Sequence, residues 1–369
     1  MSVRTCARRA GGVGRASMAV ALGMLCVSAR TALAHAGTTV SALAQNHPYR
    51  HGVVPMRGRQ PAAAGRLTTG GELQYHGGTG GQGVVTGAPQ VYLVFWGSQW
   101  GSVATNSGGD VTLAGDPVGM APVLQEFMKG LGTNGETWSG VMTQYCQGAV
   151  MGAETCAAGT AHVGHPAGGV LAGVWVDGSS AAPLEASGHQ IGLEAVSAAT
   201  HFGNTSQTAN GNAQYVIVSP SATHPDGFNT PSAQFCAWHD WTGDNTLSGG
   251  AVASPYGQLA FTNLPYVTDA GTSCGQRLVN SGAGGALDGV TIVEGHEYAE
   301  TLTDPYPSSG WVDSSGNEDA DKCAWITSGQ GAAQDLALST GTFAVQSTWA
   351  NDGDGGSGGC EISHPMVGN

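Results

Sequence analysis

The feature that most constrains this chain is a concentration of acidic residues near its C-terminus. Only 10% of the 369 residues are charged, yet residues 295–323 (GHEYAETLTDPYPSSGWVDSSGNEDADKC) contain seven of the 26 acidic residues, one Lys and a single His. Aliphatic and aromatic residues surround these carboxylates and a cysteine follows them, which indicates partial burial. Buried carboxylates must be paired or coordinated. The fold therefore has to bring a cation or basic partners to these acids.

The first part of this stretch has the pattern H-E-x-x-E. If residues 296–303 are helical, His296 and Glu300 project from the same face, and Glu297 lies about 100° round the helix. This arrangement matches the H-E-x-x-H zinc helix, in which the intervening Glu is the general base, with Glu300 in place of the second His. Carboxylate oxygen is a legitimate zinc ligand, although two carboxylates with one His weaken zinc as a Lewis acid.

Further ligands can come from the second part of the stretch. Glu318 lies 18 residues beyond Glu300, and Asp321 lies three residues further on. A turn over residues 305–310 can return this loop to the helix. We expect His296, Glu300, Glu318 and Asp321 to form a divalent metal site, with zinc as the first expectation, and Asp321 to orient His296. On its own, H-E-x-x-E also occurs often on solvated helices.

Two further polar residues can contribute to this site. His239 lies in FCAWHDW, residues 235–241, beside an acid and between two Trp. It can ligate the metal, polarise a substrate carbonyl or stabilise an oxyanion, so we place it with Glu297 as a candidate catalytic residue. The alternative is a structural His in an aromatic cluster. Asp304 ends the expected helix before Pro305 and either binds a second cation or caps the turn.

The first 34 residues have the features of a secretory signal peptide. Four Arg precede an apolar run over residues 18–28, and Ala-Leu-Ala at 32–34 is a cleavage site. The run is too short to span a bilayer, so we expect a secreted protein, extracellular or periplasmic. Residues 35–70 are expected to be a flexible leader, either a disordered linker or a pro-segment that docks on the acidic domain. Residues 71–369 are expected to form one domain.

Six cysteines follow the signal peptide, and an even number in an exported protein indicates disulfides. Proximity in the sequence favours the first pair, and sequence order then suggests the other two. The expected pairs are Cys146–Cys156, Cys236–Cys274 and Cys323–Cys360. The last would tie the acidic loop to the C-terminal segment. Zinc–thiolate sites are disfavoured because the sequence has no C-x-x-C.

The charge distribution excludes two classes of partner. From residue 67 onward, 26 acidic residues face three basic ones, which gives a net charge of −23. Nucleic acid and anionic membrane are therefore not expected partners. We expect a protein or peptide substrate, or a cell-wall component, and a monomeric chain. The sequence has no G-x-S-x-G, so a serine hydrolase of the elbow type has no support.

Strand and helix patterns alternate along the domain. β-Branched and aromatic runs predict strands at residues 90–97, 168–176, 214–219 and 259–266. Helical spacing of apolar residues is found at residues 118–131 and 185–202. This alternation predicts an α/β or α+β fold, with a mixed β-sheet flanked by helices and the metal-site helix near the C-terminus.

Several of these motifs together resemble a known family. They are VYLVFWGSQW (91–100), YVIVSP (215–220), FCAWHDW (235–241), GHEYAETLTDP (295–305) and GNEDADKCAW (316–325). Over about residues 72–326 the chain resembles secreted bacterial proteins that look related to the EXORDIUM, or phosphate-induced, family of plant cell walls. The resemblance implies a metallopeptidase interpretation of His296, Glu297 and Glu300, with Glu318 and Asp321 from the second motif. The plant relatives are associated with growth and cell-wall signalling.

Two functions remain compatible with the sequence. In a metal-dependent peptidase, the cation polarises a water and the scissile carbonyl, and Glu297 takes the proton of the water. In an extracellular binding or signalling protein, the same residues hold a structural ion such as Ca²⁺, which prefers oxygen ligands. The peptidase requires Glu297 to face an open metal position and a cleft, whereas a structural site would be closed.

Overall fold

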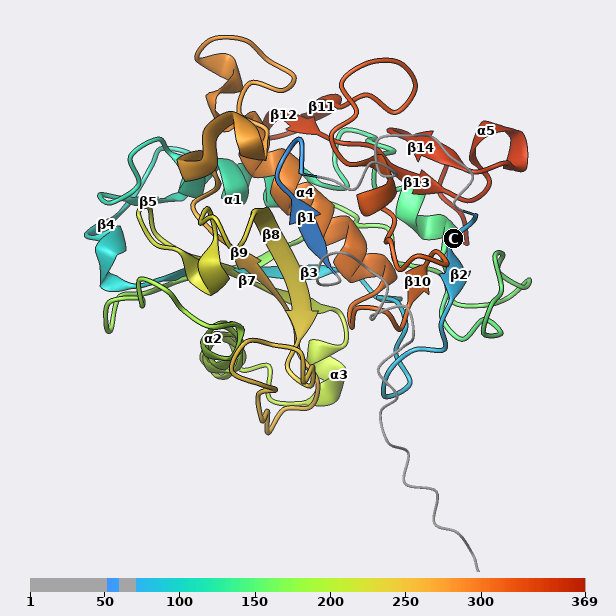
Figure 1. Cartoon of the computed structure of the whole chain (residues 1–369), viewed down its shortest axis with the longest axis horizontal. Helices are drawn as coiled ribbons and strands as arrows, with labels where there is room; N and C mark the ends of the chain where they lie inside the picture. Colours follow the sequence, from blue (N-terminus) through green and yellow to red (C-terminus); the bar gives the residue numbers. More distant parts are fainter. Residues whose placement is uncertain (1–51, 60–70, 369) are drawn as a thin grey trace, which may run out of the picture. The chain divides into compact units, whose positions relative to one another are not determined.

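The computed structural model describes residues 52–59 and 71–368, all of which belong to the compact unit formed by residues 40–369. The expected signal peptide, residues 1–34, lies outside the described residues, as does most of the expected leader. Among the described residues the largest sheet has six strands, in the order β1-β8-β9-β7-β3-β6 (Figure 1). These strands are β1 (Val53–Pro55), β3 (Gln90–Trp96), β6 (Leu171–Asp177), β7 (Ala213–Val218), β8 (Phe235–Trp241) and β9 (Ala260–Leu264).

This sheet is mixed, as expected. β3 pairs in parallel with β6 and β7, and β7 pairs in parallel with β9. β8 runs antiparallel to both β9 and β1. Parallel strands covered on both faces are continuous apolar runs, and β3 and β7 follow this rule because nearly all of their residues are buried.

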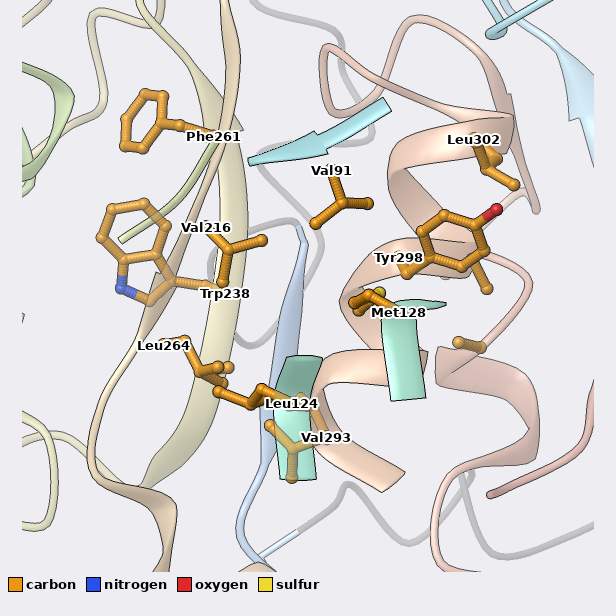
Figure 2. Close-up of a cluster of buried hydrophobic side chains, with 14 of the residues drawn as sticks. Val91, Leu124, Met128, Val216, Trp238, Phe261, Leu264, Val293, Tyr298 and Leu302 are labelled. Carbon is orange, nitrogen blue, oxygen red and sulfur yellow. The ribbon is translucent and has the colours of Figure 1, made fainter. Parts of the chain in front are cut away.

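Helices cover both faces of the sheet (Figure 1). The helices are α1 (Met120–Gly130), α2 (Gly188–Phe202), α3 (Gln207–Asn210), α4 (Asp288–Thr303) and α5 (Gly353–Gly356), of which α5 packs on β14 rather than on this sheet. Helix α2 packs on β7 and β9, while α1 and α4 pack on each other and on the opposite face. Figure 2 shows Val91 of β3 facing Tyr298 and Leu302 of α4, with Phe261 and Trp238 on the other side of the strands. The expectation of a mixed sheet flanked by helices is confirmed.

The predicted elements are found with small shifts at their ends. The strands expected at 168–176, 214–219 and 259–266 are β6, β7 and β9, and the helices expected at 118–131 and 185–202 are α1 and α2. Helix α2 begins with a capping box between Ser187 and Gln190. The metal-site helix, expected over residues 296–303, is α4 and already begins at Asp288.

Small hairpins and short 3₁₀-helices complete the fold. The two-stranded sheets pair β2 (Gln74–Tyr75) with β10 (Trp311–Val312), β4 (Val103–Thr105) with β5 (Val111–Leu113), β11 (Gln334–Leu338) with β12 (Gly341–Val345), and β13 (Thr348–Ala350) with β14 (Gly359–Glu361). The 3₁₀-helices are η1 (Ser98–Trp100), η2 (Val141–Gln144), η3 (Pro225–Gly227), η4 (Val267–Cys274), η5 (Gly284–Leu287) and η6 (Asp321–Cys323). Strand β12 packs on α4 and β13 packs on η6, so the C-terminal segment encloses α4 from the side away from the sheet.

The disulfide pairs expected from sequence order are confirmed. Cys146 bonds Cys156, Cys236 bonds Cys274, and Cys323 bonds Cys360. The third bridge ties the end of η6 to β14 and so anchors the acidic loop. Disulfides are compatible with an extracellular protein. In the part of the chain that the structure describes, every helix is too short or too polar to cross a membrane.

Strand β1 lies within the segment that the sequence predicts to be a flexible leader. Val53 and Val54 are buried and pair with Trp238 and Ala237 of β8. Trp325 Nε1–H donates to the carbonyl of Pro55 at 2.7 Å. Residues 53–55 therefore form the outermost strand of the main sheet, between β8 and the segment that follows η6.

Candidate metal centre

Helix α4 is buried along its whole length, although it carries four carboxylates and one His. All 16 residues are buried, and His296, Glu297 and Glu300 have no exposed surface. A helix that is buried all round is normally apolar. Burying a carboxylate or an imidazolium is costly unless the group is paired or coordinated. The partners of these side chains therefore decide what the helix does.

One group of possible ligands combines β8, α4 and the acidic loop. Ligand atoms of His239, Glu300 and Glu318 lie within 4.8 Å of one another, and all three residues are buried. The Nδ1 of His239 is 3.4 Å from Glu300 Oε2 and 3.4 Å from Glu297 Oε2. The Nε2 of His239 is 3.5 Å from Glu318 Oε1. Alternation along β8 turns His239 toward α4, whereas its neighbour Trp238 packs on the opposite face.

A second group shares one carboxylate with the first. Ligand atoms of His296, Glu300 and Asp321 also lie within 4.8 Å of one another. The Nε2 of His296 is 2.8 Å from Glu300 Oε1 and 3.7 Å from Asp321 Oδ1. Asp321 N–H donates to Glu300 Oε1 at 3.1 Å, which holds the start of η6 against α4. The predicted ligands are thus distributed over two groups, with Glu300 common to both.

Hydrogen bonds fix the orientation of both imidazoles. The Nε2 of His239 lies 3.1 Å from the carbonyl of Asp304, so Nε2–H donates there and Nδ1 carries the lone pair in the neutral ring. The Nδ1 of His296 lies 3.0 Å from Gln346 Oε1. The Gln346 amide is itself fixed, because its Nε2 donates to the carbonyls of Ala320 at 2.8 Å and Ser347 at 3.1 Å. The Nε2 of His296 therefore faces the carboxylates with its lone pair.

Many buried polar atoms at this centre have no hydrogen-bond partner among the described residues. They are His239 Nδ1, His296 Nε2, Glu300 Oε2 and both carboxylate oxygens of Glu294, Glu297 and Glu318. Buried polar groups in native proteins are normally satisfied, so a cluster of such atoms needs an explanation. Nitrogen and oxygen lone pairs converging on one place are what a metal ion requires. These buried His, Glu and Asp groups can hold a metal ion.

Burial and the neighbouring charges also shift the pKa values of the ionisable groups at this centre. Burial raises the pKa of Glu318 well above its usual value, with the negative charge of Glu300 adding to the effect. Burial lowers the pKa of His296, but Glu300 outweighs it and brings the pKa to about 10. Burial raises the pKa of Glu300, yet the two imidazoles together hold it at about 2. In the protein alone, protons thus supply the positive charge that a cation can provide.

Asp304 has a structural role. Its carboxylate accepts hydrogen bonds from the backbone N–H groups of Ser308 at 2.6 Å, Ser309 at 3.1 Å and Gly310 at 2.6 Å. The sequence left two roles open for Asp304, binding a second cation or capping the turn, and in the structure its carboxylate caps the turn. Its backbone carbonyl, rather than its side chain, contributes to the metal centre by orienting His239.

Sequence reasoning missed Gln346, and it assigned the orientation of His296 to Asp321. The structure puts Asp321 on the Nε2 side of His296 and Gln346 on the Nδ1 side. The available signal was a single Gln within the otherwise apolar or small FAVQSTWA run, where residues 343–350 are all buried. Glu294 was also not singled out, although it is fully buried one helical turn from Glu297.

Strand β1 covers this centre. The backbone N–H of His239 donates to the carbonyl of Gly52 at 2.8 Å. Gly52 has φ +65°, and a Cβ placed there would lie 2.7 Å from His239 Nδ1. A cavity of about 630 Å³ opens beside the far end of β1, lined by Arg57, Trp325 and neighbouring residues, but none of the metal-group side chains lines it. Gly52 and β1, which belong to the expected leader, therefore cover the side of the site next to His239.

Comparisons of this chain with protein-family models, with curated proteins and with solved structures found no match.

Proposed function

We propose that this chain is a secreted metal-dependent peptidase, with His239, Glu300 and Glu318 as the ligands of its catalytic cation and Glu297 as its general base. One observation carries the proposal. The carboxylate of Glu297 is fully buried beside His239 Nδ1, and neither of its oxygens has a hydrogen-bond partner among the described residues. A purely structural cation site does not need a further carboxylate in this position.

The residues of the chain have separate tasks in this proposal. The cation, when bound, supplies Lewis-acid activation of a water and of the scissile carbonyl. Glu297 accepts the proton of the attacking water and returns it to the leaving amine. Asp304, through its carbonyl, holds His239 with Nδ1 toward the cation. The buried surroundings strengthen every electrostatic interaction in the site.

Zinc is the first candidate for the cation, although the two carboxylates of the ligand set weaken it as a Lewis acid. Imidazole nitrogen together with carboxylate oxygen suits zinc, and one open position is typical of catalytic zinc sites. Calcium is the alternative, since Glu300 and Glu318 offer the oxygen ligands that it prefers.

The proposed substrate is a protein or peptide outside the cell. The acidic surface disfavours nucleic acid, and the disulfides suit an oxidising compartment. The resemblance to EXORDIUM-like proteins leaves a cell-wall component as a second class of target.

A non-catalytic role has one observation in its favour. His239, Glu300 and Glu318 have no exposed surface. A closed site of this kind suits a structural ion in an extracellular binding or signalling protein. The two candidates differ in whether the site opens when residues 52–59 are removed.

The experiment measures metal content and proteolysis on the same protein. The secreted chain is purified, its N-terminus is identified by mass spectrometry, and casein hydrolysis is followed with and without a chelator. Forms with and without residues 52–59 are compared. The peptidase proposal predicts bound zinc and chelator-sensitive cleavage by the form that lacks residues 52–59. Stoichiometric metal with no cleavage by either form would assign the site a structural role.

Two matched variants test the general base. Glu297→Gln should keep its metal and lose at least 100-fold in casein hydrolysis, because the proton acceptor is gone. Glu294→Gln is the control, since Glu294 is equally buried on the same helix and belongs to neither ligand group. Full hydrolysis by Glu297→Gln would overturn the assignment of the base.

A further inference from the structure

We infer that Glu300 bridges two divalent cations, the second of which is held by His296, Glu300 and Asp321. This inference rests on the metal site of the proposed function and adds a second position to it. The key feature is that the two oxygens of Glu300 face different imidazoles. Oε1 lies 2.8 Å from His296 Nε2, and Oε2 lies 3.4 Å from His239 Nδ1.

The orientation of the His296 ring supports the second cation site, and this evidence does not depend on the first site. Gln346 accepts from Nδ1, so the neutral ring presents the lone pair of Nε2 to Glu300 and Asp321. Nε2 lies 2.8 Å from Glu300 Oε1 and 3.7 Å from Asp321 Oδ1, and it is among the buried atoms without an assigned hydrogen bond in the described residues. Metal-binding histidines commonly have the second ring nitrogen fixed by a polar group in this way.

The acidic loop is held in position for this role. Asp321 N–H donates to Glu300 Oε1 at 3.1 Å, and Glu318 N–H donates to Asp321 Oδ2 at 3.2 Å. These bonds place Asp321 Oδ1 toward His296. The Cys323–Cys360 bridge anchors the end of η6, so the loop does not depend on the cation for its position. A preformed ligand set of this kind lowers the ordering cost of binding.

The charges at the centre favour two cations over one. Glu297, Glu300, Glu318 and Asp321 carry four negative charges when ionised, and His239 and His296 are neutral ligands. Two divalent cations neutralise this set without bound protons, whereas with one cation two of the carboxylates have to take up protons. Uncompensated buried charge is strongly unfavourable. A carboxylate shared by two metal ions is also the arrangement expected of a two-metal hydrolase, in which the ions stabilise the attacking and leaving groups.

The test is the stoichiometry of metal in the secreted chain and in two variants. The protein is stripped by prolonged dialysis against chelator and reloaded with Zn²⁺ for elemental analysis, or with Mn²⁺ for electron paramagnetic resonance. The wild-type chain should bind two equivalents, and two Mn²⁺ ions bridged by Glu300 should give an exchange-coupled spectrum. Asp321→Asn should bind one equivalent and give the spectrum of an isolated Mn²⁺.

Asp319→Asn is the matched control. Asp319 is a fully buried carboxylate of the same loop and belongs to neither ligand group, so Asn replaces it with a side chain of nearly the same size. This variant should keep two equivalents. His296→Gln provides a second test from the helix side and should also bind one equivalent, so the inference remains testable if Asp321→Asn does not fold.

The outcomes separate this inference from the proposed function. One equivalent in the wild-type chain, unchanged in Asp321→Asn and His296→Gln, overturns the second cation and leaves the peptidase proposal standing. Two equivalents without casein cleavage support the bridged pair and count against the peptidase. Absence of any bound metal overturns both.

Discussion

Gln346 fixes the orientation of His296, so replacing it with Leu tests whether that orientation controls metal binding. In Gln346→Leu, His296 Nδ1–H loses its acceptor, and the carbonyls of Ala320 and Ser347 lose donors. Each of these three hydrogen bonds contributes about 1 kcal/mol net, and the apolar Leu side chain recovers part of the loss. We therefore expect the free energy of unfolding of the metal-free protein to fall by about 2–3 kcal/mol.

The metal-bound protein should lose more. Removing a group that orients a ligand typically weakens metal binding by about 10–100-fold. This range corresponds to about 1.4–2.7 kcal/mol of binding free energy. At a free Zn²⁺ concentration of about 1,000 times the wild-type Kd, the cation held by His296 adds about 4 kcal/mol to stability. If Gln346→Leu weakens that site 100-fold, the same concentration adds only about 1.4 kcal/mol.

Gln125 offers a control with the same number of hydrogen bonds. It is buried, accepts from the N–H of Val111, and donates to the carbonyls of Val111 and Ala121. Gln125→Leu should therefore cost about the same in the metal-free protein, while leaving metal affinity unchanged. The assay is urea unfolding with and without Zn²⁺, combined with a competition titration against a chromophoric chelator. Equal zinc affinity in the two variants would refute the orienting role of Gln346.

Two further predictions concern stability. Burial raises the pKa of Glu194 to about 8, so this group stabilises the fold fully below about pH 4.5 and loses its contribution as the pH rises to 8. In urea unfolding, the stability of Glu194→Gln relative to wild type should therefore rise by about 3 kcal/mol between pH 5 and pH 8. Parallel pH profiles of stability for the two proteins would contradict this prediction. The bridges Cys323–Cys360 and Cys236–Cys274 span 37 and 38 residues, so replacing either pair with Ser should cost about 4 kcal/mol by loop entropy. Only the loss of Cys323–Cys360 should also weaken Zn²⁺ binding in the competition titration, and an equal effect of both pairs would argue against a specific role for the anchored loop.

Local sequence patterns predicted four of the six strands of the main sheet and the longer helices, but neither β1 and β8 nor the order of the strands. The QVYLVFW run of β3 and the helical spacing in α1 and α2 could be recognised in the sequence, because these patterns involve only residues close together in the chain. The first half of α4 was missed, since DGVTIVEG contains two Gly and four β-branched residues that are poor helix formers. Its helical conformation depends on burial between the sheet and β12, which local sequence does not encode.

The candidate site was predictable to a similar extent. The spacing of His296 and Glu300, and the density of acids around Glu318 and Asp321, identified most of the ligand atoms. The grouping was not predictable, because the position of His239 depends on the pairing of β8 with β9 across the sheet. Gln346 lies 50 residues from His296 in the sequence, so their contact is a property of the tertiary structure alone.

The cover formed by β1 also has a kinetic consequence. Gly52 lies against His239 Nδ1, and the strand that follows it is only three residues long. For a cation held beside His239 Nδ1, separation of β1 from β8 would expose this side of the site, so the rate of metal loss would depend on the frequency of that local opening as well as on the affinity. A brief exposure to chelator then reports the rate of metal loss, whereas an exposure of several days reports the affinity.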